Sequence, residues 1–241
     1  MTTTQQSTWP EQVSYPGQIH LAPGPHDMTN MYRAHFAFRR DLAKFQAAVR
    51  QTPIGAADSW RGLAERWTLF ADVLHHHHTI EDVMIWPTLR RRTEAAGDAA
   101  GTELLHAMEA EHDLIDPALT GCAAGVAAMV EHPCEDHRNA VDVHVTTARQ
   151  LLADHLRHEE TEAIPLIQDV MTAEEWEASE AYAAKALDPR KLASVVPWLV
   201  EGMAPELLAR EAAAAPLLMR VLLRLFRRRW ARRERVAFRY A

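Results

Sequence analysis

HHTIEDVMIWPTL (residues 77–89) and HLRHEETEAIPLI (residues 155–167) share one pattern: a histidine, three residues, a glutamate, five residues and a proline. The three matching pairs of residues are each 78 positions apart: His77 and His155, Glu81 and Glu159, and Pro87 and Pro165. A lone histidine precedes each motif at nearly the same distance, His35 by 42 residues and His112 by 43. The sequence therefore contains two copies of one unit.

Each unit is predicted to be a helical hairpin, because apolar residues recur at spacings of three and four. We expect a first helix from about residue 27, a second over about 60–91 with Asp58 or Ser59 as its N-cap, a third through His112 to about 129, and a fourth over about 138–168. Prolines at 87, 117 and 165 are expected to kink or end these helices. The predicted fold is all-α, an up-down antiparallel four-helix bundle.

The spacing within each motif has a chemical meaning. Residues four apart on an α-helix differ by about 40° around its axis, so the histidine and glutamate of each motif face the same side. Pairing the hairpins would gather six metal ligands around one centre: His35, His77, Glu81, His112, His155 and Glu159. A single His-x3-Glu motif is weak evidence for a metal site, because exposed side-chain pairs at this spacing are common on helices. The repeated motif indicates a site for iron, manganese or zinc, which accept mixed nitrogen and oxygen ligands.

Four consecutive histidines, residues 75–78, lie inside the second predicted helix. Their mid-chain position argues against a purification tag. His78 and Asp82 have the same spacing as His77 and Glu81, but only the latter pair keeps the 78-residue repeat in step with a glutamate. The other three histidines of the run are expected to face solvent or, at most, to support the ligands.

Composition narrows the classes of protein. The 241 residues are 48% hydrophobic, enough for a real core, and the net charge of −7 argues against a chain-wide nucleic-acid footprint. Cys122 and Cys134 form no CxxC pattern and are expected to be reduced thiols of a cytoplasmic protein. We expect no signal peptide, and no stretch approaching the roughly 18–20 apolar residues that span a bilayer.

Three regions are predicted: a polar, proline-broken arm over residues 1–24, the bundle over 25–187, and a helical, arginine-rich extension over 188–241. Thr172 and Glu175 form a capping box for a fifth helix, and Pro205 marks another helix start. Residues 216–241 hold nine arginines and one glutamate, and the apolar side chains of this basic helix share a face from which Trp230 is displaced: Leu218, Val221, Leu222, Leu225 and Phe226.

Two uses of this basic helix are considered. We favour docking of its apolar face onto the bundle or another subunit, with the arginines in solvent. Binding to an anionic membrane surface or an acidic partner is the alternative, and nucleic-acid binding ranks third.

The motifs resemble those of the hemerythrin-like, or HHE cation-binding, family over about residues 27–185. MTNMYRAHFAFRRDL (28–42) is similar to its first-helix signature, HHTIEDVMIWPTL to its second, MEAEHDLIDPAL (108–119) to its third and HLRHEETEAIPLI to its fourth. The resemblance implies two non-haem iron ions bridged by two carboxylates and an oxo or hydroxo group, held by the six side chains named above. It is compatible with a homodimer.

The sequence departs from classical oxygen-carrying members at two positions. They have a further histidine one turn before the residue matching His112, where this chain has Met108, and an aspartate where it has Glu159. His106 is no substitute, because six residues place it about 240° round the helix. A lost nitrogen ligand implies an open coordination position. That disfavours reversible oxygen carriage and favours sensing of, or reaction with, dioxygen, hydrogen peroxide or nitric oxide.

Three classes of function are compared. Catalase-like peroxide decomposition occurs among actinobacterial members, which this chain resembles in composition. A sensor or adaptor acting through the basic helix is an alternative. A ferritin-like iron oxidase is disfavoured, because Glu109-x-x-His112 has no second copy. Tyr32, one turn before His35, is a candidate ligand, but a core tyrosine is the favoured interpretation.

Overall fold

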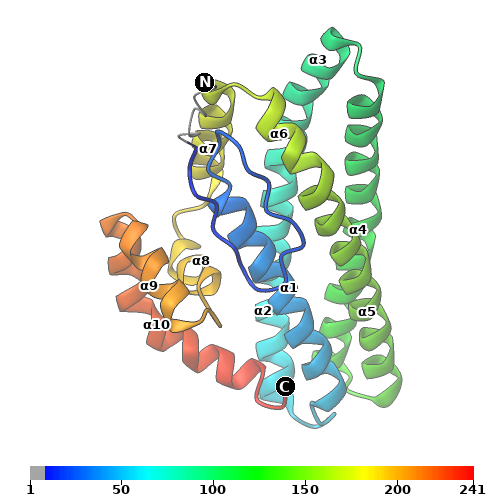
Figure 1. Ribbon diagram of the computed structural model, residues 1–241. Coiled ribbons are helices and arrows are strands. Elements are labelled where there is room, and N and C mark those ends of the chain that lie inside the picture. The colour runs from blue at the N-terminus through cyan, green and yellow to red at the C-terminus, as the bar shows by residue number, and fades with distance from the viewer. Residues whose placement is uncertain (1–8) are drawn as a thin grey trace.

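Four long helical rods form the body of the protein, and Figure 1 shows them side by side. The computed structural model describes residues 9–241, which contain helices and no strand. The first rod is α1 (Thr29–Gln51), and the third is α4 (Ala99–Glu131). The second and fourth rods are each interrupted by a π-helical segment: α2 (Ala57–Ile80), η1 (Glu81–Ile85) and α3 (Trp86–Ala96), then α5 (Glu135–His158), η2 (Glu159–Ala163) and α6 (Ile164–Val170). The predicted all-α bundle is confirmed.

The prolines are accommodated without breaking the rods. Proline lacks an N–H and its ring clashes with the carbonyl four residues earlier. The chain avoids that clash by widening one turn, so that the N–H of Trp86 bonds to the carbonyl of Glu81 and that of Ile164 to the carbonyl of Glu159. Pro117 lies inside α4, which also continues through it. Both π segments begin at a predicted ligand, and such π turns are frequent at functional sites.

The capping predictions had mixed outcomes. Thr172 and Glu175 form the expected capping box at the start of α7 (Ala173–Ala186). The N-cap predicted for α2 is wrong: the cap position is Ala56, with no side-chain hydrogen bond. Ser59 instead lies buried within the helix, and its hydroxyl donates to the carbonyl of Val236 at 2.9 Å.

Residues 9–28, the part of the N-terminal arm that the structure describes, pack against the bundle (Figure 1). Tyr15 and Ala22 are buried, and the hydroxyl of Tyr15 donates to Glu211 at 2.6 Å. The N–H of Ala22 donates to the hydroxyl of Tyr32 at 2.9 Å. Tyr32 is itself buried, so its interpretation as a core tyrosine is confirmed.

One expectation about the membrane was wrong. Among residues 9–241, α4 is long and apolar enough to cross a bilayer by length and composition. In the fold, however, α4 is an element of the bundle, and it packs along α5 with a buried face that includes Leu105, Met108, His112 and Ile115. Cys122 on this helix is buried and Cys134 after it is half-buried, and within residues 9–241 neither is bonded to another cysteine.

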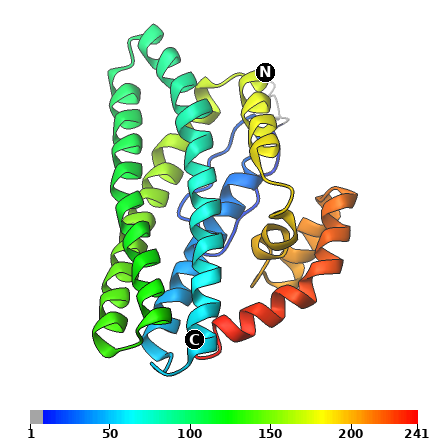
Figure 2. The same cartoon turned by 180° about the vertical axis from the view of Figure 1, so that it is seen from behind.

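The C-terminal helices lie on the outside of the bundle, beside α1 and α2 (Figure 2). They are α8 (Leu192–Leu199), α9 (Pro205–Ala214) and α10 (Leu217–Ala237). Helix α10 does dock, but the predicted docking face is wrong. Leu218, Val221 and Leu225 are exposed, whereas the supposedly displaced Trp230 is buried.

A buried ionic network explains this orientation of α10. Arg66 on α2 is paired with Asp41 on α1 at 2.7 Å and also with Glu234 on α10. The indole N–H of Trp198 donates to Asp41 at 2.7 Å. Burial acts to raise the pKa of Asp41, but the guanidiniums of Arg40 and Arg66 hold that pKa below its usual value. Because Trp230 stacks over Arg66 on the same side as Glu234, this side of α10 faces the bundle.

Replacement of Arg66 should destabilise the fold strongly. Arg66→Met removes the buried cation that Asp41 and Glu234 share. Breaking a buried ion pair typically costs about 3–5 kcal/mol, and we expect the lower end of this range because Arg40 still pairs with Asp41 and Lys44 with Glu234. Urea denaturation at equal metal loading measures the loss. Arg61→Met is the matched control, because the Arg61–Asp58 pair is exposed and should be worth about 0–1 kcal/mol. Equal stabilities for the two variants would contradict the role of the network.

Candidate metal centre

The centre of the bundle holds two adjacent groups of candidate ligands. His35, His77 and Glu159 form one group. The other contains one glutamate and three histidines: His78, Glu81, His112 and His155. Within each group, one potential ligand atom from every residue lies within 4.8 Å of all the others. The structure therefore brings together all six residues predicted from the sequence, and it adds His78.

All four rods contribute to the centre. His35 comes from α1 and His112 from α4, while α2 and α5 supply the other histidines and the two π segments supply Glu81 and Glu159. The paired rods thus place one histidine-glutamate motif from each hairpin on opposite sides of one interior space.

Glu81 lies between the two groups. Its Oε1 is 3.0 Å from His77 Nε2 in one group, and its Oε2 is 3.4 Å from His112 Nε2 in the other. Each carboxylate oxygen thus faces a different histidine.

Glu159 occupies the equivalent place in the second hairpin. Its Oε2 is 3.1 Å from His35 Nε2 and 3.8 Å from His155 Nε2. Both glutamates are therefore positioned as carboxylates shared by the two groups.

These side chains carry buried polar atoms with no hydrogen-bond partner within residues 9–241. They include both oxygens of Glu81 and Glu159, the Nε2 atoms of His35 and His77, and both ring nitrogens of His78. Burying such groups without a partner costs free energy, and native proteins rarely leave them unsatisfied. Their lone pairs converge, so cations coordinated here would satisfy them. The residues fit a metal centre.

A second layer of carboxylates holds the rings in place. Glu160 lies 3.0 Å from His35 Nδ1, Asp82 lies 2.9 Å from His112 Nδ1, and Glu111 lies 2.9 Å from His155 Nδ1. A carboxylate at Nδ1 keeps a proton there and leaves the Nε2 lone pair directed at the centre. Each of these three histidines is therefore oriented as a metal ligand.

The outer carboxylates were missed in the sequence, although the repeat contains a signal for two of them. Asp82 follows Glu81 as Glu160 follows Glu159, so they too are 78 residues apart. Burial acts to raise the pKa of Glu160, but hydrogen bonds from His35 and Arg39 hold it below its usual value. Glu160 is thus an ionised partner for His35.

His78 corrects the interpretation of the histidine run. It was expected to face solvent or to support ligands, but it is 3% exposed and its ring stacks on His112 with centroids 3.9 Å apart. Burial and the neighbouring His112 lower the pKa of His78, so its imidazole is neutral, which is the form that binds metal. His75 is exposed, as expected. Adjacent residues diverge by about 100° on a helix, and the two groups lie side by side, so His77 faces one and His78 the other.

The field of the glutamates makes the centre attractive to positive charge. Although burial acts to lower the pKa of His35, Glu159 and Glu160 raise it to about 9. Burial also acts against protonation of His112, but Asp82 and Glu81 raise its pKa to about 10. The same field that favours a proton on these rings favours a metal cation.

The family model described as the hemerythrin HHE cation binding domain matches residues 26–167 of this chain. The chain belongs to the hemerythrin HHE family. The match begins just before α1, ends within α6, and includes every residue of both ligand groups. Membership in this family supports metal cation binding at the centre, typically of iron.

A plant protein provides a more distant comparison. A BRUTUS-like zinc finger protein of Arabidopsis thaliana is 26% identical over 197 residues, which cover 78% of this chain but 15% of that protein. The chain thus spans a small part of the relative that it matches. No solved structure matches the chain.

The role of His78 can be tested within the histidine run itself. His78→Ala removes a neutral, buried nitrogen from the second group and should lower metal affinity by about tenfold or more. His75→Ala, at an exposed position on the same helix, should leave affinity unchanged. Competition with a chromophoric chelator measures both. Equal affinities for the two variants would exclude His78 as a ligand.

Proposed function

We propose that this hemerythrin HHE protein holds two non-haem iron ions and uses them to react with small oxidants, hydrogen peroxide above all. The observation that carries the two-ion count is the placement of the Glu81 and Glu159 carboxylates, each of which lies between 3.0 and 3.8 Å from histidines of both groups. His35, His77 and Glu159 would hold one iron. His78, Glu81, His112 and His155 would hold the other, with both glutamates shared.

His78 changes the coordination argument. Met108 removes a histidine from α4, and that loss pointed to an open position. The stacked ring of His78 brings a nitrogen to the same group from α2. The missing ligand therefore no longer argues against reversible oxygen binding, and the choice between carriage and reaction depends on other features of the centre.

Burial limits what can enter. The side chains of the two groups are at most about one-tenth exposed, and His77 is the least buried of them. A centre this enclosed suits ligands of two heavy atoms, such as dioxygen, hydrogen peroxide or nitric oxide, better than larger substrates. Iron bound there would supply a redox-active Lewis acid.

A chain of side chains leads from the centre to solvent. His155 Nδ1 lies 2.9 Å from Glu111 Oε2, and Glu111 Oε1 lies 2.7 Å from His158 Nδ1. Glu111 and His158 are 29% and 27% exposed. Disproportionation of two hydrogen peroxide molecules to two waters and dioxygen requires protons to move between the peroxides. A proton held at His155 Nδ1 can exchange with solvent along this chain, which supports the peroxide reaction over simple oxygen carriage.

Metal analysis and oxygen evolution test the proposal together. Protein reconstituted anaerobically with ferrous iron should retain two irons per chain and evolve dioxygen from added peroxide. Glu81→Ala should lose iron and turnover, because it removes the shared carboxylate. Glu94→Ala, at an exposed position on α3, is the matched control and should behave as wild type.

The possible failures are distinguishable. Fewer than two bound irons in the wild type would contradict the two-ion centre. Two bound irons with no dioxygen evolved would leave the centre standing and refute the peroxide reaction.

A sensor or adaptor role is a second candidate, and one contact favours it. Phe38 lies between the centre and the C-terminal helices, with its ring centroid 5.3 Å from that of His77 and 5.7 Å from that of Trp198. Trp198 is also bonded to Asp41, which belongs to the network that holds α10. A change in the position of His77 would therefore shift Phe38 and, through it, Trp198 on α8.

Hydrogen exchange tests this coupling. Iron loading should slow amide exchange in α8 and α10 of the wild type, because a fixed His77 restrains Phe38 and Trp198. In Phe38→Leu, which shortens the connecting side chain, the effect on these helices should shrink while exchange near His112 still responds to iron. Identical exchange of α8 and α10 with and without iron would rule the coupling out.

A further inference from the structure

The outward side of α10 is apolar as well as basic. Leu217, Leu218, Val221 and Leu225 are exposed, between 41% and 68%. At 100° per residue these four side chains fall within an arc of about 100°, and Trp230, which docks on the bundle, points about 180° away from Val221. The helix therefore carries a second apolar face, here called the outer stripe (Leu217, Leu218, Val221 and Leu225), directed away from the protein.

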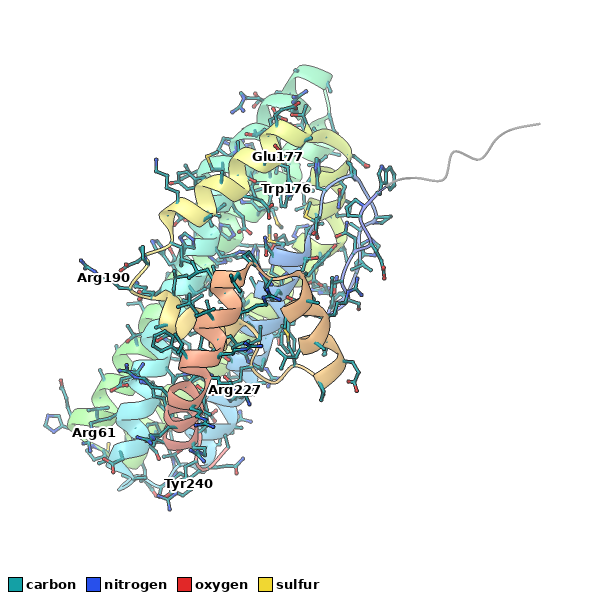
Figure 3. All side chains as sticks on the ribbon, turned by 90° about the vertical axis from the view of Figure 1, so that its left-hand side faces the viewer. Arg61, Trp176, Glu177, Arg190, Arg227 and Tyr240 are labelled. Carbon is teal, nitrogen blue, oxygen red and sulfur yellow. The ribbon has the colours of Figure 1, made fainter. Side chains whose placement is uncertain are left out.

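Arginines border and continue the outer stripe. Arg220, Arg224 and Arg228 recur every four residues along one edge of it, and all nine arginines of residues 216–241 are exposed. Arg227, labelled on α10 in Figure 3, is one of these exposed arginines. This charge is local, because the whole chain carries a net charge of −7.

Towards the C-terminus the same helix lines a cleft against α2, with a volume of about 630 Å³. Four of its arginines belong to the C-terminal end of the chain, Arg232, Arg233, Arg235 and Arg239, whereas Arg66 is neutralised by Asp41 and Glu234 and Arg61 is paired with Asp58. Its acids are Asp58 and Glu65. Cations thus outnumber acids where the outer stripe ends, which is an arrangement suited to anionic groups.

We propose that the outer side of α10 binds an anionic lipid surface, with the outer stripe inserted among the acyl chains and the arginines against the headgroup phosphates. A helix with apolar side chains on one face and arginines beside them lies in a membrane interface, and its long arginine stems let the charges reach the headgroups. A second copy of this chain fits the surface less well, since antiparallel pairing of two α10 helices would bring like-charged arginine rows together. This inference does not rest on the iron centre.

Vesicle sedimentation of the full chain tests the proposal. Wild type should pellet with vesicles of equal parts phosphatidylglycerol and phosphatidylcholine, less so as salt is raised, and should stay in solution with phosphatidylcholine alone. Leu218→Glu combined with Leu225→Glu, and separately Arg224→Gln combined with Arg228→Gln, should each weaken binding about tenfold or more. These side chains are exposed, so the variants should fold, which circular dichroism checks.

The matched control places the same substitution elsewhere. Leu114 on α4 and Val143 on α5 are 60% and 64% exposed, so Leu114→Glu combined with Val143→Glu should bind anionic vesicles as wild type does. Wild type that stays in solution with anionic vesicles would overturn the proposal. So would vesicle binding that the leucine variant keeps and the arginine variant loses, because that pattern indicates electrostatic attraction to the headgroups without insertion of the outer stripe. A dimer in light scattering that the leucine variant abolishes would assign the surface to a second copy.

Discussion

The structure depends on the cost of burying ionisable groups at the centre of the bundle. Five imidazoles and two carboxylates meet there with little or no exposure, and many of their polar atoms have no hydrogen-bond partner within residues 9–241. Such a core is stable where bound cations satisfy the lone pairs. Without them, the free-energy cost of burying an unpaired charge exceeds the stabilisation that packing of the same side chain provides. The outer carboxylates follow from the same constraint, since each ring whose Nε2 faces inward needs an acceptor for its Nδ1 proton.

The two hairpins satisfy this constraint for each other. Asp82 of the first hairpin supports His112 of the second, while Glu160 of the second supports His35 of the first. Neither hairpin can orient its own lone histidine by these contacts. The π turns take part, because Glu81 and Glu159 begin them and each outer carboxylate is the next residue. Widening the turn accommodates the proline and also places two consecutive acids where one faces the metals and the other a ring.

The packing of the C-terminal helices also depends on buried charges that need partners. Arg66 is buried between Asp41 and Glu234, and this triad, rather than the apolar content of α10, decides which side of the helix faces the bundle. A helix with two apolar faces can satisfy only one of them against the bundle. The ion network selects the side with Trp230 and Glu234, and the outer stripe is left beside its arginines.

The sequence by itself determined the helical class, the four rods and the six principal residues of the centre, because a 78-residue repeat of histidine and glutamate at helical spacing is readable without coordinates. Tertiary structure alone decided three things. It placed His78 in the centre, since adjacent helical residues diverge and two ligand groups lie side by side around α2. It assigned Asp82 and Glu160 to rings of the opposite hairpin and Glu111 to the ring of His155 on the neighbouring helix, since these contacts join residues that lie 30 to 125 positions apart in the sequence. It also decided which side of α10 packs against the bundle. Apolar periodicity shows which side chains share a face of the helix, but it does not show that Glu234 pairs with the buried Arg66.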